Sequence, residues 1–290
     1  SIILQDLFKG GASIPTLPEV FYQFKKTVDD PDSSFEDLAD VVASDLGLTA
    51  RILKIVNSPI YWFSNPVETI PHAISIIGGV QMTDLVLSTC IIDRFDQASL
   101  KGLDIQLFWE HGIACGLSAK ILAKHLKMPN PESLFVGGLL HDIGRLVICL
   151  NASDLFSEIY LKSQTDKISL LNAENKKLGF DHTQVGEELL RIWGLPKIHQ
   201  ETVRYHHNPM EAPQFKQEAA LIDIANNISK SLGLGSSGEL FEPKFNPASL
   251  EILGLKDESF FMEIRDEVQE QYQNTIAECV NDFETLNVIN

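Results

Sequence analysis

The stretch Ser133–Leu150, SLFVGGLLHDIGRLVICL, sets a histidine and an aspartate, His141 and Asp142, side by side in an otherwise apolar run. Burying such an ionisable pair is costly unless a charge, a hydrogen bond or a metal ion compensates it. Imidazole and carboxylate are common ligands of divalent transition metals, and adjacent helical residues lie close enough to share one ion. Three glycines in the same stretch let another backbone or a ligand approach closely. Taken alone, the dipeptide favours an ordinary hydrogen-bonded pair inside a helix.

Composition sets the broad class of the protein. The chain has 290 residues, 44% of them hydrophobic, which is enough for one large domain or two small ones. The formal net charge of −17 argues against direct nucleic-acid binding and against adhesion to an anionic membrane. No apolar run reaches 18 residues, the first residues lack a secretory pattern, and the four cysteines are scattered in apolar segments. We therefore expect an acidic protein of the bacterial cytoplasm with reduced thiols and no membrane span.

The hydrophobic pattern is helical in almost every segment. Leu48, Ile52 and Ile55 form one stripe, for example, and Ser33 or Ser34 can cap the helix before it. None of the short apolar runs shows the sustained alternation of a strand. We expect an all-α fold, a multi-helix bundle in which an N-terminal helical subdomain packs on a second helical subdomain. The predicted parts are residues 1–100, 101–232, and a C-terminal loop and helix, 233–290, with a seam near DQASLKGLD.

Five of the eight histidines lie at the ends of predicted helices or beside another candidate ligand: His111, His141, His182, His206 and His207. Separate helices of a bundle can direct such side chains, with Asp142, to one interior point. A site with three or more histidines and a carboxylate suits one or two ions of Fe, Mn, Zn or Ni, and it supports hydrolysis. We expect the other three histidines, His72, His125 and His199, not to be ligands.

Longer motifs carry a family resemblance. The first half contains IPTLPEVFYQF and DLGLTARILKIVNSPIYWFSNPVETIPHAISIIGG, and the second contains FWEH, LLHDIGRLVI, GFDHTQVGEELLRIWGLP and YHHNP. With these motifs the chain resembles an HDOD domain, a divergent branch of the HD phosphohydrolase superfamily, from about Ile14 to Ile228. The second-half motifs are also similar to HD-GYP phosphodiesterases, which cleave cyclic di-GMP at a two- or three-metal site. The resemblance makes residues 101–232 an HD-like part and implies six metal ligands: His111, His141, Asp142, His182, His206 and His207.

Several positions depart from the HD-GYP pattern. Arg145 stands where those enzymes generally have lysine, and arginine keeps the charge that could grip a phosphate. The chain has no Gly-Tyr-Pro tripeptide, and Asn226 occupies the place of a late metal-binding aspartate. Asp223, one helical turn earlier, and Glu110 are weaker candidate ligands. Asp142 and Arg145 remain the candidates for a catalytic role.

Two functions of different class follow from the resemblance. HDOD proteins are generally regarded as regulatory, which implies a non-catalytic signal-transduction protein with a retained metal pocket and an unidentified protein partner. The alternative is a metal-dependent phosphohydrolase that acts on a nucleotide or a cyclic dinucleotide. A third interpretation, in which the histidines persist as hydrogen-bonded core residues near Asp142 and Glu110, agrees with the first function equally well.

Overall fold

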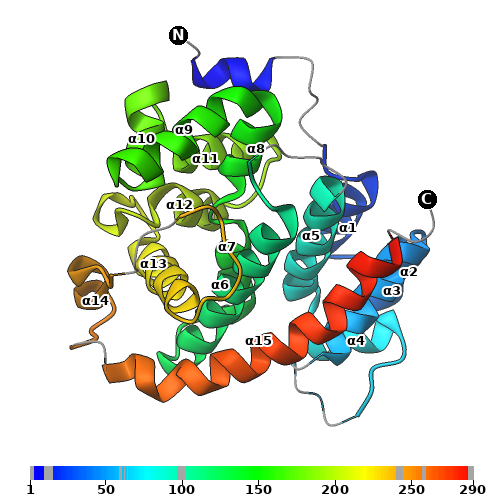
Figure 1. The fold of residues 1–290 in the computed structure, drawn as a ribbon. Helices are drawn as coiled ribbons and strands as arrows, with labels where there is room; N and C mark the ends of the chain where they lie inside the picture. Colours follow the sequence, from blue (N-terminus) through cyan, green and yellow to red (C-terminus); the bar gives the residue numbers. More distant parts are fainter. Residues whose placement is uncertain are drawn as a thin grey trace. The chain divides into compact units, whose positions relative to one another are not determined.

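The computed structural model describes residues 3–9, 16–58, 61, 63, 65–96, 102–239, 244–256 and 259–286, without the side chains of 93, 94, 96 and 277–286. Every regular element in these ranges is helical (Figure 1), which confirms the predicted all-α fold. The predicted seam near residue 100 falls in 97–101, outside the described residues. The division into 1–100, 101–232 and 233–290 therefore stays a prediction.

Backbone contacts divide the chain into two compact units, and each is described by itself. The first unit consists of Ser1–Thr16 and Phe95–Arg265, and the second consists of Leu17–Arg94 and Asp266–Asn290. All the candidate ligands belong to the first unit.

The second unit is built mainly from five helices: α1 (Glu19–Asp29), α2 (Phe35–Ala43), α3 (Leu46–Asn57), α4 (Ile70–Ile77) and most of α5 (Gly79–Asp96). Side chains cap three of their N-termini. Ser34 accepts from the Asp37 N–H and starts α2, and Asp45 and Thr69 do the same for α3 and α4. Helix α2 packs against α1, α3 and α4, so their apolar stripes share one core.

The first unit contains α6 (Ile105–His125), α7 (Pro131–Leu140), α8 (Ile143–Asn151), α9 (Ser153–Asp166), α10 (Leu170–Leu178), α11 (His182–Ile192), α12 (Lys197–Tyr205), α13 (Lys216–Ser231) and α14 (Pro247–Ile252), with the short helices η1 (Leu4–Phe8) and η2 (Pro209–Glu211). Its centre is the pair α6 and α7, against which α12 and α13 also pack (Figure 1). Helix α8 packs on α11 and α9. This arrangement surrounds the start of α6 and the end of α7 with other helices.

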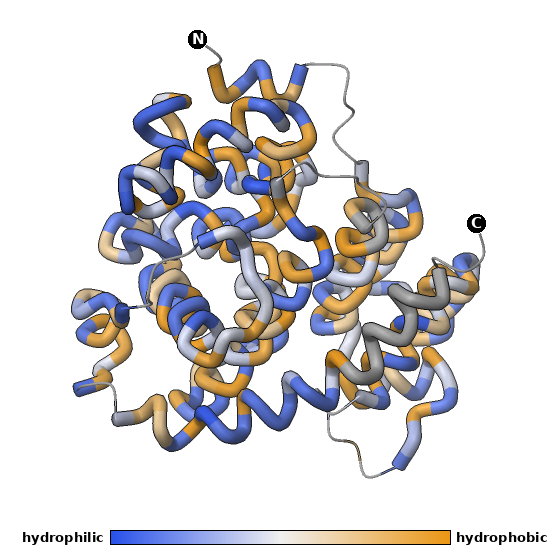
Figure 2. The backbone as a smooth tube through the Cα atoms, viewed as in Figure 1, coloured by the Kyte–Doolittle hydropathy of each residue, from blue (hydrophilic) through white to orange (hydrophobic). Residues whose placement is uncertain are grey.

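The last helix, α15 (Ser259–Leu286), carries residues of both units. In its coloured part hydrophobic and hydrophilic residues are interspersed (Figure 2), and the apolar residues Ile264, Val268 and Tyr272, which recur at helical spacing, are buried. The side chains beyond residue 276 lie outside the described ones. The buried stripe agrees with a helix that docks on its own chain.

The apolar surroundings of the His-Asp dipeptide predict that it lies inside one helix. In the structure it lies between two helices instead. Helix α7 ends at Leu140 and α8 begins at Ile143, so His141 and Asp142 form the joint between them. Asp142 has φ −100° and ψ 8°, which interrupts the helical backbone. Apolar residues flank the joint on both sides, and for this reason the sequence pattern does not reveal it.

One segment, Pro131–Asn151, is long and apolar enough to cross a membrane by length and composition, and the bent pair Ile70–Ile77 with Gly79–Ile92 passes the same test. Polar residues interrupt the segment Pro131–Asn151, so it contains no uninterrupted apolar run of 18 residues. Within the protein 83% of its apolar window is buried, as in the core helix of a bundle. The absence of a membrane span stays a prediction.

Candidate metal centre

A contact between glycines brings the first two histidines together. A Cβ atom on Gly138 of α7 would lie 2.7 Å from the Cα of Gly116 on α6, a distance that real side chains do not tolerate. The two helix backbones therefore touch where they cross. One end of this crossing holds His111 and His141, whose ring centroids are 5.3 Å apart.

A second glycine contact brings Asp142 to a third histidine. A Cβ on Gly144 of α8 would overlap the carbonyl oxygen of His182 and lie 2.7 Å from the backbone nitrogen of Gly186, both on α11. Only glycine at position 144 permits this approach. As a result Asp142 Oδ1 lies 3.1 Å from His182 Nε2. The close approach expected for the glycines of the opening stretch is thus confirmed at Gly138 and Gly144.

The local backbone orients two of the imidazole rings. His141 Nδ1 lies 2.7 Å from the carbonyl oxygen of Gly138, and His206 Nδ1 lies 2.8 Å from that of Val203. A carbonyl oxygen can only accept, so each Nδ1 carries the proton. In the neutral ring this leaves the Nε2 lone pair free, and it points into the unit's interior.

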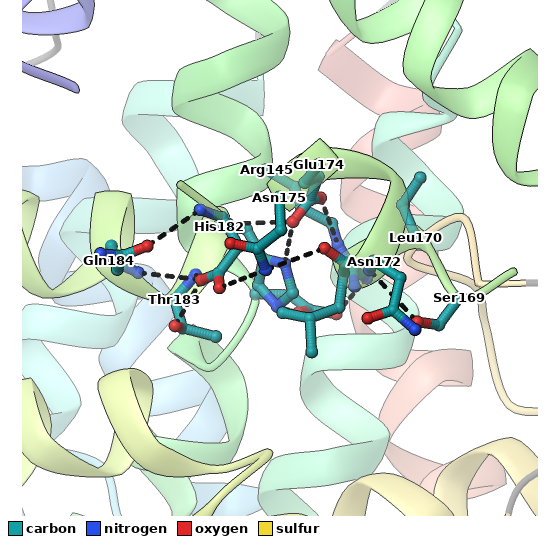
Figure 3. Close-up of polar contacts among 12 residues, drawn as sticks. Arg145, Ser169, Leu170, Asn172, Glu174, Asn175, His182, Thr183 and Gln184 are labelled. Atoms are coloured by element: carbon teal, nitrogen blue, oxygen red, sulfur yellow. Dashed lines mark hydrogen bonds and ion pairs between the residues drawn. The ribbon is translucent and has the colours of Figure 1, made fainter. Parts of the chain in front are cut away.

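Glu174 of α10 orients the ring of His182. Its Oε2 accepts from the backbone N–H of His182 and lies 2.6 Å from His182 Nδ1 (Figure 3). Its other oxygen lies 3.6 Å from Nε of Arg145. A buried carboxylate behind a histidine fixes the tautomer and the ring, as the second layer of metal sites does.

Asp142 lies at the centre of the cluster. Its Oδ2 accepts from Arg145 Nη1 at 2.7 Å and lies 3.2 Å from His141 Nε2. Its Oδ1 lies 3.1 Å from His182 Nε2 and 3.8 Å from His206 Nε2. The two carboxylate oxygens therefore face different surroundings, Oδ2 a guanidinium and one imidazole, and Oδ1 two imidazoles.

The six predicted ligands fall into two overlapping groups, each compact enough to hold one ion: His111, His141 and Asp142 in the first, and Asp142, His182, His206 and His207 in the second. In the second group, Nε2 of all three histidines and Oδ1 of Asp142 are buried without a hydrogen-bond partner among the described residues. Unsatisfied buried polar atoms are costly, and a divalent transition metal would satisfy all four. The residues therefore fit such an ion, and the metal-binding role itself stays a prediction.

Asn226 of α13 reaches the first group. Its Oδ1 lies 3.1 Å from His111 Nε2, while His111 Nδ1 lies 3.4 Å from the carbonyl oxygen of Leu234. Both ring nitrogens of His111 therefore have a polar neighbour within the protein. An asparagine here adds an oxygen atom to the group without adding negative charge.

The two weaker carboxylate candidates lie outside both groups. The side chain of Glu110 is half-buried and accepts a hydrogen bond from Gln106, one turn earlier on α6. Asp223 is buried and accepts from the Ser249 hydroxyl and from the side chain of Asn227. Asp223 thus joins α13 to α14 instead of replacing the aspartate that is absent at 226.

The loop at residues 234–238, which follows α13, lies against His111 and Arg145. A Cβ on Gly235 would overlap the backbone nitrogen of His111, so the loop backbone lies directly on α6. Two residues further on, Arg145 Nη1 donates to the hydroxyl of Ser237 at 2.8 Å and to its carbonyl oxygen at 3.2 Å. Arg145 is fully buried beneath this loop.

Burial and neighbouring charges shift the pKa values of the candidate ligands in opposite directions. Burial alone lowers the pKa of His141, but the Asp142 carboxylate and Cys115 together outweigh it and raise that pKa to about 10. Burial alone raises the pKa of Asp142, but Arg145 and then His141 hold it well below its usual range. Burial keeps the pKa of His206 and of the half-buried His207 well below the usual range, so both rings are neutral and able to bind a metal.

The histidines predicted not to be ligands belong to neither group. His72 and His125 are exposed, and His199 is buried at the start of α12.

Sequence reasoning missed Glu174 and Ser237. For Glu174 a signal existed, since it shares the buried face of α10 with Leu170 and Ala173; a charged residue on an apolar face needs a buried partner. For Ser237 no signal existed.

Comparisons with known proteins agree with the geometry. A family model described as HDOD domain matches residues 14–209. A curated relative, an uncharacterized protein of Treponema pallidum, is 23% identical over 221 residues, which cover 73% of this chain and 41% of the relative. The chain thus spans less than half the length of that relative.

Several solved structures share the fold. An HDOD domain protein of unknown function from Geobacter sulfurreducens has a TM-score of 0.80 at 24% identity, with 95% of this chain and 96% of that chain covered. A candidate signal-transduction protein from Marinobacter aquaeolei has a TM-score of 0.71 at 24% identity, with 96% and 60% covered. A candidate phosphohydrolase from Shewanella amazonensis has a TM-score of 0.73 at 21% identity, with 95% and 97% covered. At these identities the likeness establishes the fold alone.

Proposed function

The chain belongs to the HDOD domain family, and on that premise we propose that it is a regulatory signal-transduction protein that retains an HD-like metal pocket without catalysing hydrolysis. The Marinobacter structure, which bears the name of a candidate signal-transduction protein, supports the regulatory part. The non-catalytic part rests on the surroundings of Arg145.

The state of Arg145 is the observation that carries the proposal. A side chain that grips a substrate phosphate has to present free donors to it. In this chain Nη1 is engaged by Asp142 and Ser237, and the donors without a hydrogen-bond partner among the described residues, Nε and Nη2, are fully buried and do not reach solvent. The same contacts hold the positive charge of Arg145 against the Asp142 carboxylate. In a metal-dependent hydrolase that carboxylate would bind the metal ion.

Five of the six candidate ligands are also shut off from solvent, and His207 is half-buried. His111, His141, Asp142, His182 and His206 are all at most 2% exposed. A bound transition metal would supply an acidified water and a Lewis acid for a phosphoryl oxygen. Both need a substrate within contact distance, and the closed pocket with its covering loop favours a structural use of the ion.

The alternative function is a metal-dependent phosphohydrolase or cyclic-dinucleotide phosphodiesterase. Two observations favour it: the two ligand groups share Asp142, as the bridging carboxylate of a two-metal site does, and a candidate phosphohydrolase shares the fold. For that function the loop at 234–238 would have to move away from Arg145 before substrate could enter.

A turnover assay separates the two functions. Protein loaded with Mn or Fe is incubated with cyclic di-GMP and with an aryl phosphodiester, next to the Asp142→Ala variant prepared in the same way. We expect both proteins to give the same background rate. Turnover by the wild type that Asp142→Ala abolishes would establish the phosphohydrolase and contradict the regulatory proposal.

The proposal extends to place and partner. We place the protein in the bacterial cytoplasm, in keeping with its acidic composition and scattered cysteines. Its partner is a protein of the same signalling pathway, and neither direct nucleic-acid binding nor membrane attachment is part of its function. Capture of a defined cytoplasmic partner by the purified full chain, with a loss of binding on denaturation, is the corresponding test.

A further inference from the structure

We propose that the pocket takes a single divalent transition-metal ion, held by Asp142 Oδ1 and the imidazoles of His182, His206 and His207, and that the His111–His141 group remains free of metal. This inference deepens the proposed function, because it rests on the retained pocket. It assigns the ion to the group that contains no residue of α6.

In the His111–His141 group, His141 Nε2 is the one ligand atom buried without a hydrogen-bond partner among the described residues, and the other two ligand atoms have polar neighbours within the protein. His111 Nε2 faces Asn226 Oδ1 at 3.1 Å, and Asp142 Oδ2 accepts from Arg145 Nη1 at 2.7 Å. A cation at this group would sit beside a guanidinium that already neutralises its carboxylate oxygen. Like charges at such distances repel strongly in a buried site.

The other group is not satisfied. His182, His206 and His207 bring buried Nε2 atoms that have no hydrogen-bond partner among the described residues, and the same holds for Asp142 Oδ1. These four atoms lie within 4.8 Å of one another. Two of the rings are held from behind, His182 by Glu174 and His206 by the carbonyl of Val203. Three imidazoles, two of them oriented in this way, and one carboxylate oxygen form a complete donor set for Zn, Fe, Mn or Ni.

The charge balance sets the number of ions at one. Near the pocket Asp142, Glu174 and Glu239 carry negative charge, and Arg145 and Lys230 carry positive charge. One divalent ion together with the two basic side chains already exceeds the charge of the three carboxylates. A second ion would add two more positive charges to a buried volume, and at the place where a further carboxylate could balance them stands the neutral Asn226.

Metal stoichiometry tests the inference directly. The full chain is stripped with chelator, reloaded with Zn or Co, freed of unbound metal and measured by elemental analysis, and its affinity is determined against a chromophoric chelator. We expect one equivalent in the wild type. His207→Ala, which removes a half-buried ligand, should lower the affinity at least about tenfold, whereas the matched variant His111→Ala should keep one equivalent.

Cobalt provides a readout independent of activity. The visible bands of Co bound to nitrogen and oxygen ligands should be the same in His111→Ala and in the wild type, and they should shift in His207→Ala. Should His207→Ala fail to fold, as judged by circular dichroism, His207→Gln takes its place, because it keeps a side chain of similar size.

Three outcomes contradict the inference. Two equivalents in the wild type would show that both groups bind an ion, and loss of metal in His111→Ala with retention in His207→Ala would assign the ion to the other group. No bound metal would refute this inference together with the retained metal pocket of the proposed function, and would leave the non-catalytic part of that proposal standing. Conversely, turnover by protein with one equivalent would refute the regulatory proposal and leave this inference intact.

Discussion

Arg145 Nη1 lies 2.7 Å from Oδ2 of Asp142, and both side chains are buried three residues apart at the start of α8. The protein thus places its own cation on one oxygen of the carboxylate and leaves the other oxygen to the histidines. Removing either partner of such a buried pair leaves an uncompensated charge, which is far costlier than loss of a surface ion pair. Four predictions follow from this arrangement and from the contacts around it.

Glu174→Gln should weaken metal binding without removing a ligand. Glutamine keeps the shape of the side chain but removes the charge behind His182 Nδ1. Loss of such a partner typically lowers metal affinity by about 10–100-fold. Titration of the loaded protein with a competing chelator measures the change. Glu158→Gln, an exposed carboxylate on α9, is the control and should leave the affinity unchanged. Equal affinities for the three proteins would contradict the role of Glu174.

Gly144→Ala should destabilise the first unit. The added methyl group would overlap the His182 carbonyl and force α8 away from α11. We expect the free energy of unfolding to fall by about 2–4 kcal/mol, as measured by urea denaturation. Gly47→Ala is a matched control, because Gly47 is also the second residue of a helix and its Cβ would meet nothing closer than 3.4 Å. That variant should be unchanged or more stable by less than about 1 kcal/mol. A loss no greater than in Gly47→Ala would show that the α8–α11 contact adjusts freely.

Gly235→Ala should loosen the covering loop and expose the pocket. Gly233 and Gly235 have φ of +66° and +65°, so alanine costs a similar backbone strain at either position. A Cβ at 233 meets nothing within 4 Å, whereas at 235 it would overlap the backbone of His111. We expect a chelator to remove bound metal at least about tenfold faster from Gly235→Ala, which corresponds to about 1.4 kcal/mol of loop destabilisation. Gly233→Ala should release metal at the wild-type rate, and equal rates in both variants would exclude a gating role for the loop.

Stability should depend on pH through Asp223. Burial raises the pKa of Asp223 from its ordinary 3.8 to about 6. The folded state therefore holds the proton more tightly, and the resulting stabilisation is complete below pH 3.8 and is lost as pH rises through 6. Relative to Asp223→Asn, the wild type should lose about 1–3 kcal/mol between pH 4 and pH 7 in urea denaturation. The exposed Asp40→Asn is the control. A difference between wild type and Asp223→Asn that does not vary with pH would contradict this assignment.

The sequence predicted the helical class and the set of histidines that meet, because both depend on local pattern. Apolar positions at helical spacing require buried faces, and histidines at helix ends reach the interior of a bundle. The break between α7 and α8 at His141 was not predictable, since apolar residues flank it on both sides. Nor was the contact of Ser237 with Arg145, 92 residues earlier in the chain, because it depends on where the loop after α13 crosses α6. Asn226, which occupies the place of a metal-binding aspartate in the resemblance, contacts His111.

The glycine contacts have a consequence for how such sequences evolve. Gly116, Gly138 and Gly144 fix the helix crossings that bring the histidines and Asp142 together, and they do so through packing alone. Selection for a stable fold would preserve these glycines, and with them the geometry of the pocket, whether or not a protein turns over a substrate. A His-Asp signature in a genome therefore does not by itself identify an enzyme, which has to be recognised by its access route and by a free phosphate-binding cation.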